Sequence, residues 1–269
     1  MNWHKQEVAT NRLQSIAIAG AWGYIGRKIL EASRASGLRV YVYDPGAAPA
    51  DLSLEAVTRI TDEAKFYDLE VDGFHLALHP EARATGLNRL LQRAQSESFL
   101  ILNEKPMVSP EHPEAGRALI DAVDRSRAVM LYDFPELFDP LTRRVVEYLG
   151  SFEQVEISSV VLERSKDREY PALARNYKRM VAIQFQESVH CLAYVLYLLA
   201  ALRGSLAATL PAGVGVDARS MPYSPPNPEA YPCVVDGRCE YRLSLGRLTV
   251  EGLTHFKRGA RWTKRRVLR

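Results

Sequence analysis

The first half of the chain alternates short apolar runs with stretches in which apolar residues recur every three or four positions. Residues 15–19 form an apolar run that ends at Gly20, which suits a buried parallel strand. A helix is expected over 23–36 with Gly37 just beyond its end, and 39–43 is expected to form the next strand. Strand, helix and strand in this order predict a β-α-β unit.

The same rhythm continues to about residue 132. Strands are expected near 73–78, 99–102 and 128–132, with helices over 81–95 and 109–125 between them. Ser109 followed by Pro110 is a good N-cap and first-turn pair for the second of these helices. Strands that alternate with helices predict a parallel sheet covered on both faces.

The pattern changes after Asp133. A helix is expected over 140–149, a β-rich run over 153–162, and a helix over 186–202 that is apolar nearly all round and therefore buried between layers. Two alternating segments, 238–245 and 247–256, meet at Gly246 and predict a hairpin. Five prolines within 219–232 exclude regular structure there, so that segment is either a rigid surface connection or a lid or subunit-contact loop.

These patterns predict an α/β chain of two domains. Residues 1–133 are expected to form a doubly wound parallel sheet of the Rossmann type that binds a dinucleotide. Residues 134–269 are expected to form an α+β domain on a mainly antiparallel open sheet that binds substrate. Such an open sheet would suit pairing of subunits into a homodimer or homotetramer.

Composition narrows the class of protein further. The 269 residues are 47% hydrophobic, which is normal for a globular protein, and a formal charge of +3 is too small to demand a nucleic-acid partner. Three cysteines without a C-x-x-C pair indicate neither a disulfide framework nor a thiolate metal site. No segment has the apolar length of a signal peptide or a membrane span. We therefore expect a cytoplasmic protein with no membrane partner and no bound metal.

The loop after the first strand spaces its glycines as G-x-x-G-x-x-G. A dinucleotide site needs a tight turn at Gly20, close approach of the backbone to the pyrophosphate at Gly23, and close packing of helix on strand at Gly26. The start of the following helix then faces the anion. The residues expected to hold the cofactor here are Gly20, Trp22, Gly23, Tyr24, Ile25 and Gly26.

Asp44 follows the second strand, 24 residues beyond Gly20. A carboxylate at this point accepts hydrogen bonds from the ribose hydroxyls of adenosine and repels a 2′-phosphate, which favours NAD over NADP. The alternative is that Asp44 only begins the turn formed with Pro45 and Gly46.

Lys105 is the leading candidate for chemistry. It lies in Asn103-Glu104-Lys105-Pro106-Met107, directly after the apolar run 99–102. An ionisable lysine past a buried strand, downstream of a nucleotide-binding turn, is where a doubly wound sheet presents its ligands. An exposed Glu-Lys-Pro at an ordinary turn is the alternative.

Together, the strand, the glycine turn, the acid after the second strand and the later Glu104-Lys105-Pro106 resemble the Gfo/Idh/MocA family of sugar and polyol dehydrogenases. The resemblance covers residues 15 to about 150, including Leu131-Tyr132-Asp133-Phe134 and Phe138-Asp139-Pro140. It implies that the protein is an NAD-dependent enzyme, which interconverts a secondary alcohol and a ketone on a sugar, a polyol or a related small polar molecule. It also implies that Lys105 transfers the proton, that Glu104 and Pro106 shape the nicotinamide site, and that His79 and Pro80 lie in a loop beside the cofactor.

The resemblance further implies a motif D-x-x-x-H-x-x-D on a helix of the second domain. His190 matches its histidine, but Gln186 and Ala193 stand at the two aspartate positions, and Glu187 is one residue along. We expect His190 to assist Lys105, and Gln186 and Glu187 to lie with it at the substrate. Two alternatives stay open, namely that His190 is an ordinary core histidine and that the chain is a non-enzymatic relative acting as a nucleotide sensor or assembly module.

Other families fit less well. Dihydrodipicolinate reductase resembles the chain in its glycine turn and length, but its histidine-rich and Gly-Thr-rich motifs are absent. Aspartate dehydrogenase would leave Glu104-Lys105-Pro106 unexplained.

Two polar segments complete the candidates. Residues 257–269 carry seven cations and form either a solvated edge strand and tail or a grip for an anionic ligand. Arg175 and Lys178, with Tyr170, Asn176 and Tyr177, form either a substrate-domain loop or ordinary surface.

Overall fold

The chain folds into two compact units, which divide between Asp133 and Phe134. The computed structural model describes residues 13–108, 113–168, 170, 183–203, 213–223 and 235–269. Each unit has a hydrophobic core of its own.

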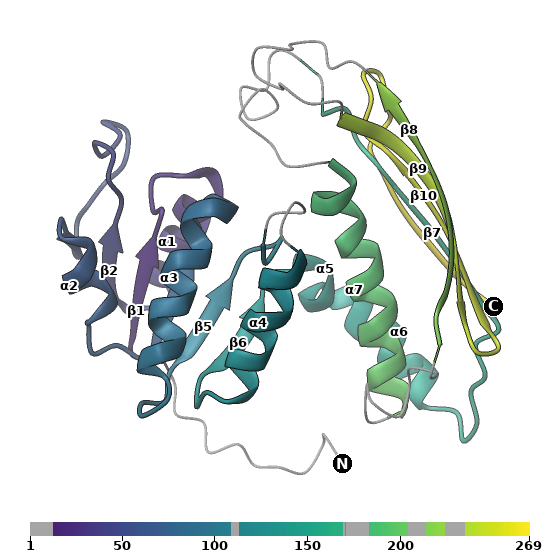
Figure 1. The fold of residues 1–269 in the computed structure, drawn as a ribbon, viewed down its shortest axis with the longest axis horizontal. Coiled ribbons are helices and arrows are strands. Elements are labelled where there is room, and N and C mark those ends of the chain that lie inside the picture. Colours follow the sequence, from purple (N-terminus) through teal and green to yellow (C-terminus); the bar gives the residue numbers. More distant parts are fainter. Residues whose placement is uncertain (1–12, 109–112, 169, 171–182, 204–212, 224–234) are drawn as a thin grey trace. The chain divides into compact units, whose positions relative to one another are not determined.

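The first unit is a parallel sheet of six strands in the order β3-β2-β1-β4-β5-β6, which confirms the predicted Rossmann-type fold (Figure 1). Its strands are β1 (Ser15–Ala19), β2 (Arg39–Tyr43), β3 (Val57–Ile60), β4 (Gly73–Leu76), β5 (Leu100–Asn103) and β6 (Val129–Tyr132). Its helices are α1 (Tyr24–Ala35), α2 (Glu63–Tyr67), α3 (Pro80–Arg93) and α4 (Pro113–Asp124).

Alternation along β1 shows why both faces of this sheet are covered. Ile16 and Ile18 join the core that contains Leu30 of α1, whereas Ala17 and Ala19 join the core that contains Leu87 of α3. Successive side chains of a strand point to opposite faces, so an entirely apolar strand needs helices on both sides. The predicted burial of β1 is therefore confirmed.

Two elements of this unit were not predicted. The edge strand β3 has two exposed central residues, Thr58 and Arg59, so it lacks the apolar run that marked its neighbours. Helix α2 has only five residues and is capped by Asp62, whose carboxylate accepts hydrogen bonds from the amides of Ala64 and Lys65. The predicted N-cap pair Ser109-Pro110 lies outside the described residues.

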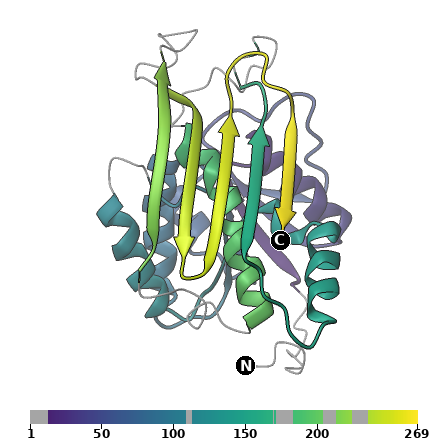
Figure 2. The ribbon, with the colours of Figure 1, turned by 90° about the vertical axis from the view of Figure 1, so that its right-hand side faces the viewer.

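The second unit is a sheet of five strands in the order β11-β7-β10-β9-β8 (Figure 2). All neighbours pair antiparallel except β7 and β10, which confirms the predicted α+β unit with a mainly antiparallel sheet. Its elements are α5 (Pro135–Phe138), α6 (Pro140–Gly150), β7 (Ser159–Ser165), α7 (Ile183–Arg203), β8 (Gly215–Tyr223), β9 (Val235–Leu245), β10 (Leu248–His255) and β11 (Thr263–Leu268).

Helix α7 covers one face of this sheet. Tyr194, Val195 and Leu198 of α7 share a core with Val160 of β7 and Val250 of β10. This packing confirms the prediction of a buried helix. The predicted hairpin of β9 and β10 is also confirmed, and its turn includes Gly246 at a φ of 63°.

Two predictions in this unit were wrong in part. The strand predicted from Glu153 begins at Ser159, because β10 pairs with β7 only from Ser159 and β11 pairs with it only from Val160. Residues 219–223 belong to β8, although the prolines were expected to exclude regular structure. Pro222 is tolerated because β8 is an edge strand and its pairing is irregular between Met221 and Pro222. The rest of that segment, 224–232, lies outside the described residues.

Candidate active site

The glycine turn between β1 and α1 has no room for a side chain at Gly20 or Gly26. Gly20 adopts a φ of 76°, and a Cβ there would lie 2.6 Å from the carbonyl oxygen of Ala77. A Cβ on Gly26 would overlap the carbonyl oxygen of Gly20. Within α1, all of which is described, no side chain caps the first turn and no acidic residue lies in it. The turn therefore presents close backbone and the positive end of a helix dipole, as an anionic diphosphate requires.

Asp44 fastens this turn to the end of β2. Its Oδ2 accepts a hydrogen bond of 3.0 Å from the amide of Trp22, and its Oδ1 accepts one of 3.0 Å from the amide of Gly46. Asp44 therefore helps to form the turn with Pro45 and Gly46, which was the alternative considered for it. A carboxylate offers about four acceptor positions, so two amide bonds leave capacity for ribose hydroxyls.

Two arginines that sequence reasoning missed brace the same turn. Arg59 of β3 donates to the carbonyl of Gly46 at 3.1 Å, and its guanidinium lies 5.9 Å from the Trp22 ring. Arg27 of α1 donates to the carbonyl of Trp22 at 3.2 Å and pairs with Asp51. Neither belongs to a local motif, so the sequence carried no signal for them.

The Glu104-Lys105-Pro106 segment follows β5 and is held by Arg83. Glu104 and Pro106 are buried, Lys105 is half-buried, and the Lys105–Pro106 peptide bond is cis. The Arg83 guanidinium, only 3% exposed, donates to the carbonyls of Glu104, Pro106 and Leu78. The sequence did indicate that Arg83 is buried, because it lies on the same stripe of α3 as Leu87, Leu90 and Leu91.

These loops come together at one edge of the sheet. The glycine turn, the His79 loop and the Lys105 loop follow the carboxyl ends of β1, β4 and β5, which are neighbouring parallel strands. The close approach of Gly20 to Ala77 and the bonds from Arg83 tie the three loops to one another. His79 is exposed at the start of α3, and Pro80 is the first residue of that helix. Ligands bind at this edge in open α/β sheets.

Glu104, which precedes Lys105, forms a buried pair with His75. His75 Nε2 lies 3.2 Å from Glu104 Oε1, and His75 is fully buried. Burial lowers the pKa of His75 to about 4, an effect that Arg83 reinforces and Asp133 opposes. Burial also raises the pKa of Glu104 above its ordinary value. The pair therefore favours a neutral imidazole beside a carboxyl group that holds its proton unusually well.

We expect the His75 ring to stay neutral when the pH falls through 6.5, because its pKa in the folded chain is about 4. An unfolded histidine takes up a proton near 6.5, so the unfolded chain binds more protons between these two values. The stability linked to neutral His75 is thus present above pH 6.5 and is lost as the pH falls toward 4. NMR titration of the ring Cε1–Hε1 signals, assigned with His75→Gln, measures this, and a midpoint near 6.5 would contradict it.

His190 lies in the second unit, on α7, and is bound by a glutamate that sequence reasoning missed. Its Nδ1 lies 2.8 Å from Oε2 of Glu136 on α5, and both residues are buried. The Phe134 ring packs edge-on against the imidazole at 5.6 Å. Glu136 thus places a carboxylate against the imidazole, whereas positions 186 and 193 carry Gln and Ala.

Cations surround this pair. Glu136 Oε1 accepts from Arg164 at 2.5 Å and lies 3.1 Å from Lys264 Nζ. Arg164 also pairs with Glu187 at 3.0 Å, and Glu187 pairs with Lys166 at 2.7 Å. Burial alone would raise the pKa of Glu136, but its bond to His190 and the Arg164 charge hold that pKa far below its ordinary value.

The structure therefore joins His190 and Glu187 in one charged network through Glu136 and Arg164. Burial lowers the pKa of Lys166 to about 8 even though Glu187 pairs with it. Gln186 lies one residue before Glu187 on α7. Lys105 and His190 belong to different units.

The basic C-terminal segment includes an edge strand, which agrees with the first of its two interpretations. β11 pairs with β7 at one edge of the sheet, opposite the β8 edge. Two of its cations have partners on α5 and α7, since Lys264 pairs with Glu136 and Arg266 lies 4.5 Å from the Tyr194 ring. Arg175, Asn176, Tyr177 and Lys178 lie outside the described residues.

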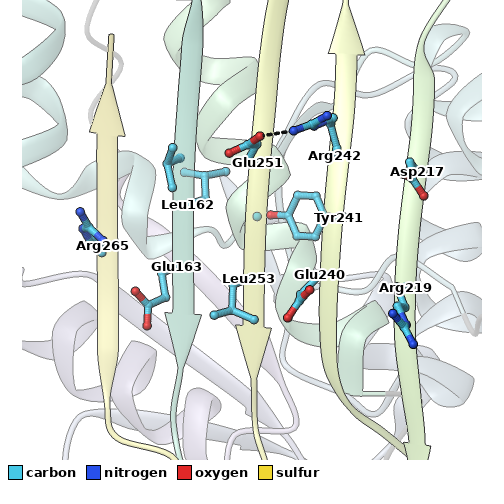
Figure 3. Close-up of a pocket in the computed structure, with 12 residues that line it drawn as sticks. Leu162, Glu163, Asp217, Arg219, Glu240, Tyr241, Arg242, Glu251, Leu253 and Arg265 are labelled. Atoms are coloured by element: carbon cyan, nitrogen blue, oxygen red, sulfur yellow. Dashed lines mark hydrogen bonds and ion pairs between the residues drawn. The ribbon is translucent and has the colours of Figure 1, made fainter.

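The other face of this sheet is lined by charged side chains of both signs around a shallow hollow of about 570 Å³ (Figure 3). Arg242 pairs with Glu251 at 2.6 Å, and Arg265 stands opposite Glu163 in the register of β11 with β7. Among the described residues, no group of His, Cys, Asp or Glu has the arrangement of a metal site. No helix in the described part of the chain is both long enough and apolar enough to cross a membrane.

The chain combines a Rossmann-type parallel sheet with an open mixed sheet, and this fold is found in solved structures of dehydrogenases. Solved structures with this fold include the myo-inositol dehydrogenase of Corynebacterium glutamicum, at a TM-score of 0.69 and 15% identity over 96% of this chain and 75% of that one. Another is the myo-inositol dehydrogenase of Lactobacillus casei in complex with NAD(H) and myo-inositol, at 0.70 and 14% over 96% and 71%.

A third is the WlbA dehydrogenase of Thermus thermophilus in complex with NAD and UDP-GlcNAcA, at a TM-score of 0.64 and 18% identity over 95% of this chain and 81% of that one. No protein-family model and no curated protein sequence matches the chain. At these identities the comparisons confirm the predicted fold.

Proposed function

We propose that the protein is an NAD-dependent oxidoreductase that interconverts a secondary alcohol and a ketone on a sugar, a polyol or a related small polar molecule. The observation that carries this proposal is the meeting of the glycine turn, Asp44 and the Lys105 loop at the carboxyl edge of one parallel sheet. The NAD complexes of structures with the same fold support it.

The residues at this edge fit a dinucleotide. The glycine turn and the uncapped start of α1 would bind the diphosphate, with Trp22, Tyr24 and Ile25 beside it. Asp44 would accept the ribose hydroxyls, while His79, Pro80, Glu104 and Pro106 would line the nicotinamide end. When bound, NAD supplies the acceptor or donor of the hydride.

Lys105 is the proposed proton-transfer group, taking the hydroxyl proton when alcohol is oxidised and returning it when ketone is reduced. His190 is proposed to assist at the substrate together with Gln186 and Glu187. Glu136 would fix the imidazole by accepting the Nδ1 proton, because a carboxylate at that nitrogen selects one tautomer.

The two units would divide this work, with residues 1–133 binding the dinucleotide and 134–269 binding substrate and pairing subunits. The charged outer face of the second sheet supports pairing with another copy, because acids and bases alternate across it. Buried thiols at Cys191 and Cys239 support a reducing cytoplasm.

Titration with NADH, followed by fluorescence, tests the cofactor, and absorbance at 340 nm tests hydride transfer over a panel of sugars and polyols. We expect saturable NADH binding, with NADPH on the order of tenfold weaker because Asp44 repels its 2′-phosphate. Gly26→Ala should abolish binding, since its Cβ would overlap the Gly20 carbonyl.

Gly150→Ala is the matched control, because nothing lies within 4 Å of the Cβ it would add. Circular dichroism of both variants separates lost binding from lost folding. Absence of NADH binding by the wild type would end the proposal. Tight binding without turnover on any panel member would favour the nucleotide sensor instead.

A further inference from the structure

Strand β8 forms one edge of the second sheet and is exposed along its length (Figure 2). Among the described strands, β8 pairs with β9 alone. Residues 213–221 are all exposed, and the side chains include two large apolar ones, Val216 at 67% and Met221 at 49% exposure. The outer edge of such a strand presents a row of backbone N–H and C=O groups that a further strand can bind.

The two edges of this sheet differ in how they resist such pairing. β11, at the opposite edge, carries three successive cations at 264–266, and charges of one sign keep an edge strand from pairing with its own kind. β8 carries one acid, Asp217, and one base, Arg219, so its charges sum to zero. Pro222 has no N–H, and the pairing of β8 with β9 is irregular beside it. The ladder that a partner strand can use therefore ends at Met221.

The charges of the outer face alternate in sign across the strands up to this edge. Glu251 of β10 stands opposite Arg242 of β9, and Arg242 stands opposite Asp217 of β8. One step along the strands, Glu240 of β9 stands opposite Arg219 of β8. Figure 3 shows these side chains around the hollow that they line together. Since opposite charges on neighbouring strands stabilise a sheet, a strand added beside β8 fits best with a base next to Asp217 and an acid next to Arg219.

We propose that β8 binds the β8 strand of a second copy of this chain, antiparallel, about a two-fold axis at Ala218. Residues directly opposite one another share a face of the sheet, so the axis passes through a residue and not between two. An axis at Ala218 places Asp217 of each copy opposite Arg219 of the other. An axis at 217 or at 219 would instead oppose two aspartates or two arginines. The alternation of sign then continues without a break from one copy into the next.

This contact goes beyond the proposed function and differs from pairing through the charged outer face. Asp217 and Arg219 line the hollow of the outer face, so Ala218 between them lies on the face that carries α7. Two different isologous contacts on one chain give a tetramer, whereas one gives a dimer. Residues 215–221 form a short ladder, so we expect this association step to be weak and to depend on protein concentration.

A cysteine at the axis tests the register. Ala218→Cys would place two thiols opposite each other with Cα atoms about 4.5–5.5 Å apart, a separation that a disulfide bridges. We expect the full-length variant to form disulfide-linked dimers in air, measured by non-reducing gel electrophoresis beside the wild type. Ala201→Cys, at an exposed alanine of α7, is the matched control and should not cross-link. No cross-link at 218, or equal cross-linking at 201, overturns the proposal.

Charge variants test the same axis without a covalent bond. Ala218 is exposed and stands opposite Tyr241 within its own sheet, so a charge there meets no like charge in the same copy. Ala218→Lys and Ala218→Glu each oppose like charges across the axis and should weaken the association about tenfold, measured by analytical ultracentrifugation over a concentration series. An equimolar mixture of the two variants should recover it, because lysine then faces glutamate.

Ala201→Lys and Ala201→Glu control for the added charge and should associate as the wild type does. A wild type that stays monomeric overturns the proposal, as does association that both variants at 218 retain or that their mixture fails to recover. Pairing through the outer face alone would respond to neither change at 218. Cofactor binding and turnover are not part of the measurement, so the result is independent of the proposed dehydrogenase function.

Discussion

Lys105→Met is expected to lower kcat for hydride transfer by roughly 10²- to 10⁴-fold, the range that a positioned general acid or base contributes. NADH affinity should change little, because Arg83 binds the Glu104 and Pro106 carbonyls and so holds the loop. The measurement is the initial rate at 340 nm with the best substrate of the panel, beside an NADH titration.

Lys65→Met, at an exposed lysine in the last turn of α2, makes the same change away from this edge and should leave the rate unaltered. Lys105→Ala with added methylamine is the sharper form of the experiment. Recovery of rate with the amine identifies a lost proton-transfer group, whereas a distorted loop would gain nothing. Full activity in Lys105→Met would remove the lysine from the proposed chemistry.

The first unit was predictable because its signals are local. The apolar runs of β1 and β5, the glycines of the turn and the acid after β2 each lie within a few residues of the element they define. Where local signals were weak, prediction failed, as with β3, whose two central residues are exposed. Arg59 was missed because nothing beside it in the sequence indicates the carbonyl that it binds. Arg83 was marked only by its position on the buried stripe of α3, which does not indicate the carbonyls that it binds.

The second unit depended more on distant pairing. β7 begins where β10 and β11 come into register with it, and the apolar residues before Ser159 gave no hint of that limit. Glu136 precedes His190 by 54 positions and Arg164 by 28, so no motif links them. The helix that carries His190 could be predicted from its sequence. The carboxylate of Glu136, which contacts the histidine, was found only from the fold.

Glu136→Gln is expected to lower the free energy of unfolding of the second unit by about 3 kcal/mol, because the buried Arg164 then keeps only Glu187 as a carboxylate partner and the half-buried Lys264 loses Glu136. The amide keeps an oxygen that can accept from His190 Nδ1, so this variant removes charge while retaining one hydrogen bond. Hydrogen exchange of the α7 amides and urea unfolding followed by circular dichroism measure the loss.

Glu251→Gln supplies the comparison, since it breaks the exposed pair with Arg242 and should cost less than about 1 kcal/mol. The pH dependence gives an independent check. The pKa of Glu136 lies far below its ordinary 4.5 in the folded chain, so its contribution is present above that value and is lost as the pH falls through the folded pKa. Glu136→Gln should flatten this acid limb, and equal losses in the two variants would show that the buried network contributes no more than a surface pair.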